Sequence, residues 1–243
     1  MSPSRGNRPL VLSAVRTAII SCNRCPRLRD YCQEVGRVKR AAYRQDVYWA
    51  RPVPGFGDPD ARVLFLGLAP AAHGANRTGR VFTGDGTGGS GDFLMAALKR
   101  AGFANRGTSQ RPDDGLELRD AYIAAAVRCA PPANKPLPEE VDRCLVHLVN
   151  EVAALPRLQI VVALGRIAWD AWLKLLASQG VALPRPRPVF SHGAVAHLGT
   201  LAPWYPGTLI GMYHPSRQNT NTGTVTPAMY DAVLRKVAGA LRA

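Results

Sequence analysis

The chain has 243 residues, 47% of them hydrophobic, which is enough to form one sizeable core, so residues 1–243 are predicted to be a single domain. Its longest apolar stretches are only of strand length and no secretory signal is recognisable, so we expect a cytoplasmic protein that does not enter a membrane. Thirty-one basic side chains against 17 acidic ones give a net charge of +14, which predicts a polyanionic partner, with nucleic acid first. A GC-rich genome is an alternative explanation of so many arginines.

The chain begins with a predicted helix at residues 9–21, followed by a basic, cysteine-bearing stretch to residue 60 that is rich in turn residues. We expect residues 1–60 to pack on the core. Four strand–helix units follow, with strands at 62–67, 121–127, 159–164 and 208–213 and helices at 92–101, 138–155, 166–177 and 226–241. This alternation predicts an α/β fold, a three-layer α/β/α sandwich around a parallel sheet of about four strands, with the functional site at their carboxyl ends.

Four cysteines are spaced as two pairs, Cys22-x2-Cys25 near the N-terminus and Cys129-x14-Cys144 in the middle of the chain. Four soft thiolates select a tetrahedral zinc ion or an iron–sulfur cluster, and a chain of this length has no need of a disulfide framework. The wide second pair favours a cluster over zinc, and buried structural thiols are the third alternative. Cys32 is predicted to be an ordinary half-buried thiol.

Unusual residues gather in the loops that follow three of the predicted strands, at residues 67–86, 127–136 and 212–217. A formal match to the dinucleotide fingerprint, Gly84-x-Gly86-x-x-Gly89, begins seventeen residues after its strand and therefore fails its structural context. The sequence contains no phosphate-binding loop with its lysine, so we expect no nucleotide cofactor.

Together these loops resemble the uracil-DNA glycosylase superfamily, and most closely its family 5 (type b). The resemblance lies in the four cysteines and in three runs, Gly67 to Asp85 (GLAPAAHGANRTGRVFTGD), Arg128 to Pro136 (RCAPPANKP) and His214 to Ser216 (HPS). It implies a four-stranded α/β/α fold, a structural [4Fe–4S] cluster held by the four cysteines, and a monofunctional DNA N-glycosylase of base excision repair. Such an enzyme hydrolyses the N-glycosidic bond of uracil and other damaged bases flipped out of double-stranded DNA, leaving an abasic site.

The resemblance makes Asp85 the residue that positions or activates the attacking water and His214 the residue that steadies the leaving base. Breaking the bond builds positive charge on the sugar and negative charge on the base, so a carboxylate and a hydrogen-bond donor lower the barrier together. Phe82 is expected to stack on the extruded base. Taken singly, each has an ordinary alternative: Asp85 as a turn former, Phe82 as a core anchor, and His214 as a structural histidine.

Further residues of the same loops are expected at the substrate. The candidate base-pocket residues are Gly67, Ala69, His73, Asn134 and Ser216, and the candidate DNA contacts, which wedge or grip the duplex, are Arg217, Gln218 and Asn219. For Asn134 the alternative is a simple loop cap. Leu68 and residues 124–126 occupy positions where other branches carry polar side chains, so we predict a broad substrate range that includes hypoxanthine and uracil opposite guanine.

Two other functions stay open on the sequence alone. A non-catalytic metal-cluster protein that regulates by binding DNA would bind without releasing a base. A nucleotide-dependent α/β enzyme would need the phosphate-binding motifs that are missing here. Nothing in the sequence demands more than a monomer.

Overall fold

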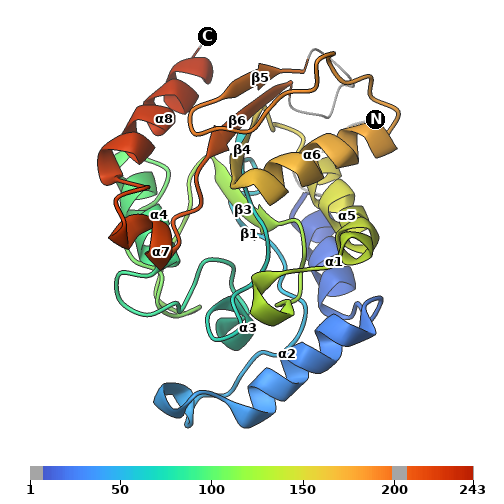
Figure 1. The fold of residues 1–243 in the computed structure, drawn as a ribbon, viewed down its shortest axis with the longest axis vertical. Helices are drawn as coiled ribbons and strands as arrows, with labels where there is room; N and C mark the ends of the chain where they lie inside the picture. Colours follow the sequence, from blue (N-terminus) through green and yellow to red (C-terminus); the bar gives the residue numbers. More distant parts are fainter. Residues whose placement is uncertain (1–7, 199–206, 243) are drawn as a thin grey trace.

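A computed structural model of the protein describes residues 8–198 and 207–242 and shows a six-stranded mixed sheet with the order β1-β3-β2-β4-β6-β5 (Figure 1). The strands are β1 Phe56–Gly57, β2 Val63–Gly67, β3 Ala121–Ala125, β4 Ile160–Leu164, β5 Val195–His197 and β6 Thr208–Met212. The four central strands are parallel, which confirms the predicted sheet, whereas β1 and β5 add an antiparallel strand at each edge. Neither edge strand was predicted, because two and three residues are too few to show a strand pattern.

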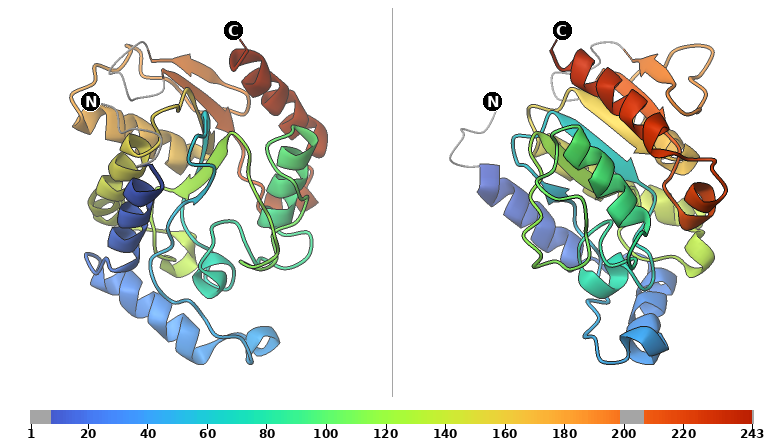
Figure 2. Two further views of the ribbon diagram at one scale, coloured as in Figure 1. Left: turned by 180° about the vertical axis from the view of Figure 1, so that it is seen from behind. Right: turned by 90° about the vertical axis from the view of Figure 1, so that its left-hand side faces the viewer.

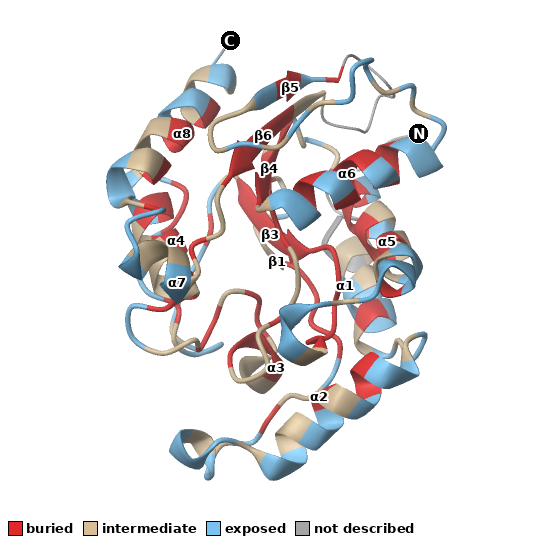
Figure 3. Ribbon diagram, in the orientation of Figure 1, coloured by how far each residue is buried: buried red, intermediate tan, exposed pale blue. Residues whose placement is uncertain are grey.

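Helices cover both faces of the sheet, as predicted (Figure 2). The helices that flank it are α1 Arg8–Ile20, α4 Ser90–Arg100, α5 Pro138–Ala153, α6 Arg166–Ser178 and α8 Pro227–Ala240. Successive side chains of a strand point to opposite faces, so Phe65 packs in the layer of α4 and α8, and Leu64 and Leu66 pack in the layer of α5 and α6. Because both layers are covered, the central strands are buried along almost their whole length (Figure 3). Within residues 8–198 and 207–242, no helix combines the length and apolar character needed to cross a membrane.

The basic stretch before β1 was expected to be rich in turns, and this was wrong for its first half, which forms the helix α2 (Pro26–Val38). Proline in the first turn suits a helix start, and one side of the helix is apolar: Leu28 and Cys32 are buried against Val127 and Cys129. This helix lies beyond the sheet and packs against α3 (Figure 1). The N-terminal segment therefore reaches the end of the sheet where the functional site was predicted.

The loops that leave the parallel strands meet at that end. The chain forms the short helix α3 (Ala75–Thr78) after β2 and the 3-10 turn η3 (Pro132–Asn134) after β3, and it forms α7 (Arg217–Asn221) after β6. After β4 it enters α6 almost directly. Since the carboxyl ends of neighbouring parallel strands lie side by side, these four connections surround one space.

Candidate active site

The loops at the carboxyl ends of the strands enclose a cleft of about 820 Å³. Its lining includes most of the residues predicted to act on the substrate: Ala69, His73, Phe82, Asp85, Asn134, His214, Ser216 and Arg217. Three predicted residues, Gly67, Gln218 and Asn219, lie outside the lining. The fold thus brings three separate loops of the sequence to one substrate-sized space.

Asp85 lies in the cleft at the end of the loop that follows β2, partly covered by protein. Desolvation raises the pKa of this carboxyl group to about 6, against the opposing positive charges of Arg217 and Arg77. Gly74 lies directly against the carboxylate: a Cβ atom at this residue would be 1.8 Å from Asp85 Oδ1. At pH 7 the group is therefore mostly ionised, yet poorly hydrated, and glycine at residue 74 is what gives it room.

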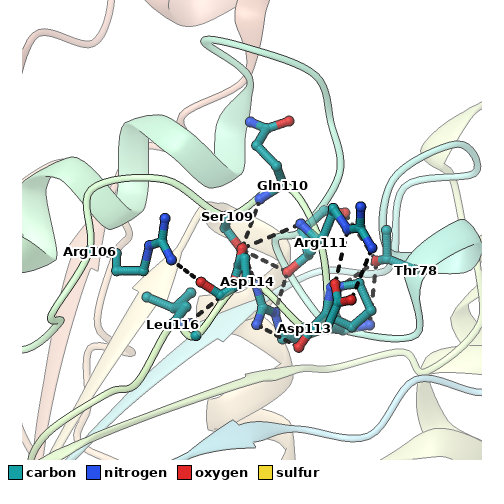
Figure 4. A network of polar contacts seen from close by, with 12 residues as sticks. Thr78, Arg106, Ser109, Gln110, Arg111, Asp113, Asp114 and Leu116 are labelled. Carbon is teal, nitrogen blue, oxygen red and sulfur yellow. Dashed lines mark hydrogen bonds and ion pairs between the residues drawn. The ribbon is translucent and has the colours of Figure 1, made fainter.

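The chain just before this carboxylate is held by the loop that joins α4 to β3. Gly84 N donates to the carbonyl of Ser109 (2.9 Å), and the Ser109 hydroxyl lies 2.7 Å from Thr83 Oγ1. Buried Arg80 donates to Thr83 Oγ1 (2.8 Å) and forms an ion pair with Asp114 (2.8 Å). The Asp114 carboxylate also accepts hydrogen bonds from backbone N–H groups of its own loop, so it lies at the centre of this polar network (Figure 4). This network was not predicted, because its arginine and its carboxylate lie 34 residues apart in the sequence.

Phe82 lines the cleft with its ring beside His214, at a centroid distance of 5.8 Å and an interplanar angle of 32°. Its backbone is left-handed (φ 50°), a conformation that costs about 1–3 kcal/mol in a residue with a bulky side chain. Gly67 lies beneath the ring, because a Cβ atom there would be 2.9 Å from Phe82 Cε2. Gly67 thus makes room for the aromatic ring and does not itself face the cleft.

His214 follows β6, and desolvation lowers the pKa of its imidazole to about 4, so the ring is neutral at pH 7. Its carbonyl accepts a hydrogen bond from Asn219 Nδ2 (2.8 Å), and Ser216 caps α7 by accepting from the Asn219 N–H group (3.3 Å). Asn219 therefore shapes this loop from within. Arg217 reaches from the loop to the backbone carbonyl of Asp85 (3.1 Å) and joins the two candidate catalytic loops.

The remaining predicted residues line the walls of the cleft. His73 Nδ1 lies 3.0 Å from the hydroxyl of Tyr48, and desolvation lowers the pKa of the His73 imidazole. Asn134 lines the cleft from η3 with a left-handed backbone (φ 57°). Leu68 and Ala125 contribute apolar surface to the cleft, at positions predicted to lack side chains that hydrogen-bond the base.

The N-terminal segment contributes two cleft residues that the sequence analysis missed, Arg40 and Tyr43. Arg77 of α3 anchors this segment: its guanidinium lies 3.9 Å from the centroid of the Tyr43 ring and pairs with Asp46 (2.5 Å). The same side chain donates to the Gly84 carbonyl (2.7 Å). The excess of arginine in this segment was the signal available in the sequence, but placing the segment at the cleft required α2, which was not predicted.

A second, smaller cavity, the thiol cavity, is lined by the four cysteines predicted as ligands, Cys22, Cys25, Cys129 and Cys144. Desolvation and the neighbouring Cys129 raise the pKa of the Cys25 thiol, and desolvation raises that of Cys144 to about 12. In the described ranges no group of three or more His, Cys, Asp or Glu side chains is close enough together to hold a single metal ion. Cys32, expected to be half-buried, is fully buried outside the cavity lining, with its Sγ 3.6 Å from the Ala130 carbonyl.

The thiol cavity also collects buried nitrogen atoms. Arg29 Nε and Nη1, Arg128 Nε and Nη1, and His147 Nε2 have no hydrogen-bond partner within the described part of the chain, and all three residues line the cavity. A buried donor left unsatisfied costs about 1–3 kcal/mol. Four soft thiols together with unused donors are the environment that an anionic, thiolate-ligated group needs, so the residues present fit such a group.

Comparisons with known proteins show which families and structures the chain is similar to. The family described as the Uracil DNA glycosylase superfamily matches residues 54–238. A type-5 uracil-DNA glycosylase of Mycobacterium tuberculosis is 48% identical over 221 residues, which cover 90% of this chain and 78% of the relative. Type-5 uracil-DNA glycosylases of Thermus thermophilus (49% identity, 89% of this chain, 92% of the relative) and Pyrobaculum aerophilum (44%, 90% and 89%) are similar as well. A crystal structure of SMUG2 from Pedobacter heparinus matches 89% of this chain and 99% of its own, at 12% identity and a TM-score of 0.47.

Proposed function

The chain belongs to the uracil-DNA glycosylase superfamily and, within it, to the type-5 enzymes, and from this we propose that it removes uracil and other deaminated bases from double-stranded DNA. It is a DNA N-glycosylase, a hydrolase of DNA repair. One observation carries the proposal for this site: Asp85, His214 and Phe82 line the same cleft, which has room for an extruded base.

Asp85 supplies negative charge where breaking the glycosidic bond leaves positive charge on the deoxyribose. Because its pKa is about 6, the carboxylate is mostly ionised at pH 7. Because it is poorly hydrated, a nearby cation or a hydrogen bond from a water molecule stabilises it strongly. Asp85 therefore stabilises the developing sugar cation and orients the water that attacks it.

His214 and Phe82 act on the departing base. The imidazole is neutral at pH 7, and its one N–H group serves as a hydrogen-bond donor to a base carbonyl on which negative charge builds. The Phe82 ring replaces the stacking that the base loses when it leaves the duplex. The ring lies 5.8 Å from the imidazole, which puts the two groups within reach of one base.

The apolar part of the cleft supports a broad substrate range. Leu68 and Ala125 offer no hydrogen bond from their side chains, and a site discriminates strongly only where an analogue leaves buried polar groups unpaired. We therefore propose that hypoxanthine and uracil opposite guanine are substrates alongside other uracil-containing sites.

The basic character of the chain supports duplex DNA as the partner. The net charge is +14, and the exposed side chains of Arg166 and Arg217 line the cleft. Phosphate contacts of this kind hold the duplex while a nucleotide swings into the cleft. Action as a monomer, without a nucleotide cofactor and in the cytoplasm, completes the proposal.

The thiol cavity is evidence for a [4Fe–4S] cluster held by Cys22, Cys25, Cys129 and Cys144. A zinc ion bound by the same four thiolates is the alternative. When bound, the cluster supplies four metal–thiolate bonds that cross-link separate parts of the chain. The cysteines come from the connection between α1 and α2, from the loop after β3 and from α5, so these bonds would fasten the N-terminal segment to the core. That segment in turn brings Arg40 and Tyr43 to the cleft.

The test is release of free base from duplex oligonucleotides that carry a single uracil or hypoxanthine, followed by alkaline cleavage at the abasic site. We expect release by the wild-type protein and loss of release in Asp85→Asn. A regulator that binds DNA without chemistry would give equal binding and no alkali-labile strand with either protein, and that result would overturn the proposal.

A further inference from the structure

Five buried nitrogen atoms of residues that line the thiol cavity make no hydrogen bond within the described part of the chain. Arg29, Arg128 and His147 are 7%, 1% and 6% exposed, and their five free nitrogen atoms have no hydrogen-bond partner among the residues that the structure describes. These three residues and the four proposed ligand cysteines line the same cavity. Native proteins rarely leave buried donors unpaired, so a cluster of them around one cavity indicates an acceptor inside it.

The sequence places each donor next to a ligand cysteine. Arg29 lies one helical turn after Cys25 on α2, and its backbone N–H group bonds to the Cys25 carbonyl (3.0 Å). His147 follows Cys144 by three residues on α5, and residues three or four apart share one face of a helix. The helices that present the thiols therefore present the donors on the same side.

Arg128 immediately precedes the third ligand cysteine. Its backbone N–H group already donates to Cys144 Sγ (3.3 Å), so the chain at this point is oriented toward sulfur. Its Nη2 forms a buried ion pair with Glu151, and Arg29 Nη2 donates to the Ala50 carbonyl (3.0 Å). Each guanidinium is thus anchored by one nitrogen atom, and its other nitrogen atoms are held in place without a protein acceptor.

We propose that Arg29, Arg128 and His147 form a donor shell that hydrogen-bonds the sulfur atoms of the cluster, offsets its negative charge, and sets both its retention and its reduction potential. This inference rests on the proposed [4Fe–4S] cluster. A cluster with four thiolates is an anion, and an added electron makes it more negative. Positive charge and N–H donors stabilise the reduced state more than the oxidised one, which raises the reduction potential.

The experiment uses the full chain, reconstituted anaerobically with ferrous iron and sulfide. The removing variants are Arg29→Met and His147→Leu, and the conservative partner is His147→Gln, which keeps an N–H donor. Arg143→Met is the matched control, because Arg143 also lines the cavity but is exposed to solvent, so its charge, which acts on the Cys25 thiol, is screened more than the buried charges are. Two quantities are measured: the rate at which an iron chelator bleaches the visible absorption, and the midpoint potential in a titration followed by electron paramagnetic resonance.

We expect the removing variants to lose iron about 10–100-fold faster than the wild type, the usual effect of losing a hydrogen bond to a metal ligand, and to show a more negative midpoint potential. His147→Gln should recover most of both losses, and Arg143→Met should change both quantities far less than the removing variants do. If Arg29→Met does not fold, the pair His147→Leu and His147→Gln decides.

Unchanged retention and potential in the removing variants, in the presence of a cluster-bearing wild type, would overturn the donor shell. A wild type that takes up zinc or no metal overturns both the shell and the proposed cluster. Uracil release is measured on the same samples, so a failure of the proposed glycosylase activity is seen separately from either result.

Discussion

Asp85 is held in surroundings that favour its neutral form. Burial raises the pKa of the carboxyl group from its ordinary 3.8 to about 6, so between these values the native state binds more protons than the unfolded chain does. The free energy of unfolding therefore falls as the pH rises through this window, and the cost is fully present at pH 7. The proposed catalytic role of Asp85 and the stability of the fold are therefore opposed at this one residue.

The variant Asp85→Asn tests that opposition. We expect base release to fall by about 10²–10⁴-fold, the range associated with losing a positioned acid or base. The free energy of unfolding at pH 7 should rise by about 1–3 kcal/mol, and the gain should shrink as the pH falls toward 4. Urea unfolding at pH 7 and pH 4.5 measures the second effect. A variant less stable than the wild type at pH 7 would show that the carboxylate is not strained by its surroundings.

The pH dependence of the reaction should have one limb. In the proposed reaction base release requires ionised Asp85, so its rate constant should fall as the pH drops through about 6. His214 is neutral above about pH 4, so it adds no second change between pH 6 and 8. Single-turnover release of uracil between pH 5 and 8 measures this, and a bell-shaped profile with a maximum near pH 7 would contradict the assigned protonation states.

The contact between Gly74 and the carboxylate predicts a severe effect from one methyl group. In Gly74→Ala the added Cβ would be 1.8 Å from Asp85 Oδ1, so the carboxylate must move and base release should drop by about tenfold or more. Gly239→Ala is the control, since a Cβ atom there meets no atom within 4 Å and the residue lies in α8. The control should keep full activity and gain up to about 1 kcal/mol of stability.

At the scale of elements, Arg77 of α3 is the link between the N-terminal segment and the catalytic loop. It contacts Tyr43, Asp46 and the carbonyl of Gly84, so it is a positioning residue for the carboxylate that follows. We expect Arg77→Met to lower single-turnover release about tenfold and to shift the low-pH limb upward, because it also removes a positive charge near the carboxylate.

Arg111→Met is the matched control for this variant. Its ion pair with Asp113 is largely exposed on both sides, and solvent screens such pairs, so they add little to stability. Release and pH profile should both stay at the wild-type values. An equal loss in the two variants would mean that general charge, not the link through α3, controls the rate.

Elements with a long apolar or periodic pattern were predictable, and short or charge-rich ones were not. The parallel strands β2 and β4 are continuous apolar runs, which is why the sheet could be read from the sequence. The helix α2 was not predicted because arginines interrupt its apolar pattern, and one of them, Arg29, lies on the buried side. Arg40 and Tyr43 depend on that helix, so they could not be assigned to the cleft. The thiol cavity followed from cysteine spacing, whereas its unused donors became visible only once side chains were placed.

For the molecule as a whole, the excess of positive charge predicts DNA binding that weakens steeply with salt. A logarithmic plot of the association constant against salt concentration should be linear, and Arg217→Ala should reduce its slope by about 1 if this side chain contacts one phosphate. Arg185→Ala, an exposed arginine outside the cleft lining, is the control and should leave the slope unchanged. Fluorescence anisotropy with an uncleavable duplex measures both.

The stretch after β3 runs from the thiol cavity to the substrate cleft, with Cys129 in the wall of one and Asn134 in the wall of the other. Pro131 and Pro132 lie between them, and proline rings stiffen a chain. In a stiff stretch of chain, a displacement of the backbone at Cys129 is transmitted to Asn134. If Cys129 holds the proposed cluster, loss of its iron should therefore displace Asn134 in the wall of the cleft, so that the proposed repair activity would be lost while the polypeptide is still present.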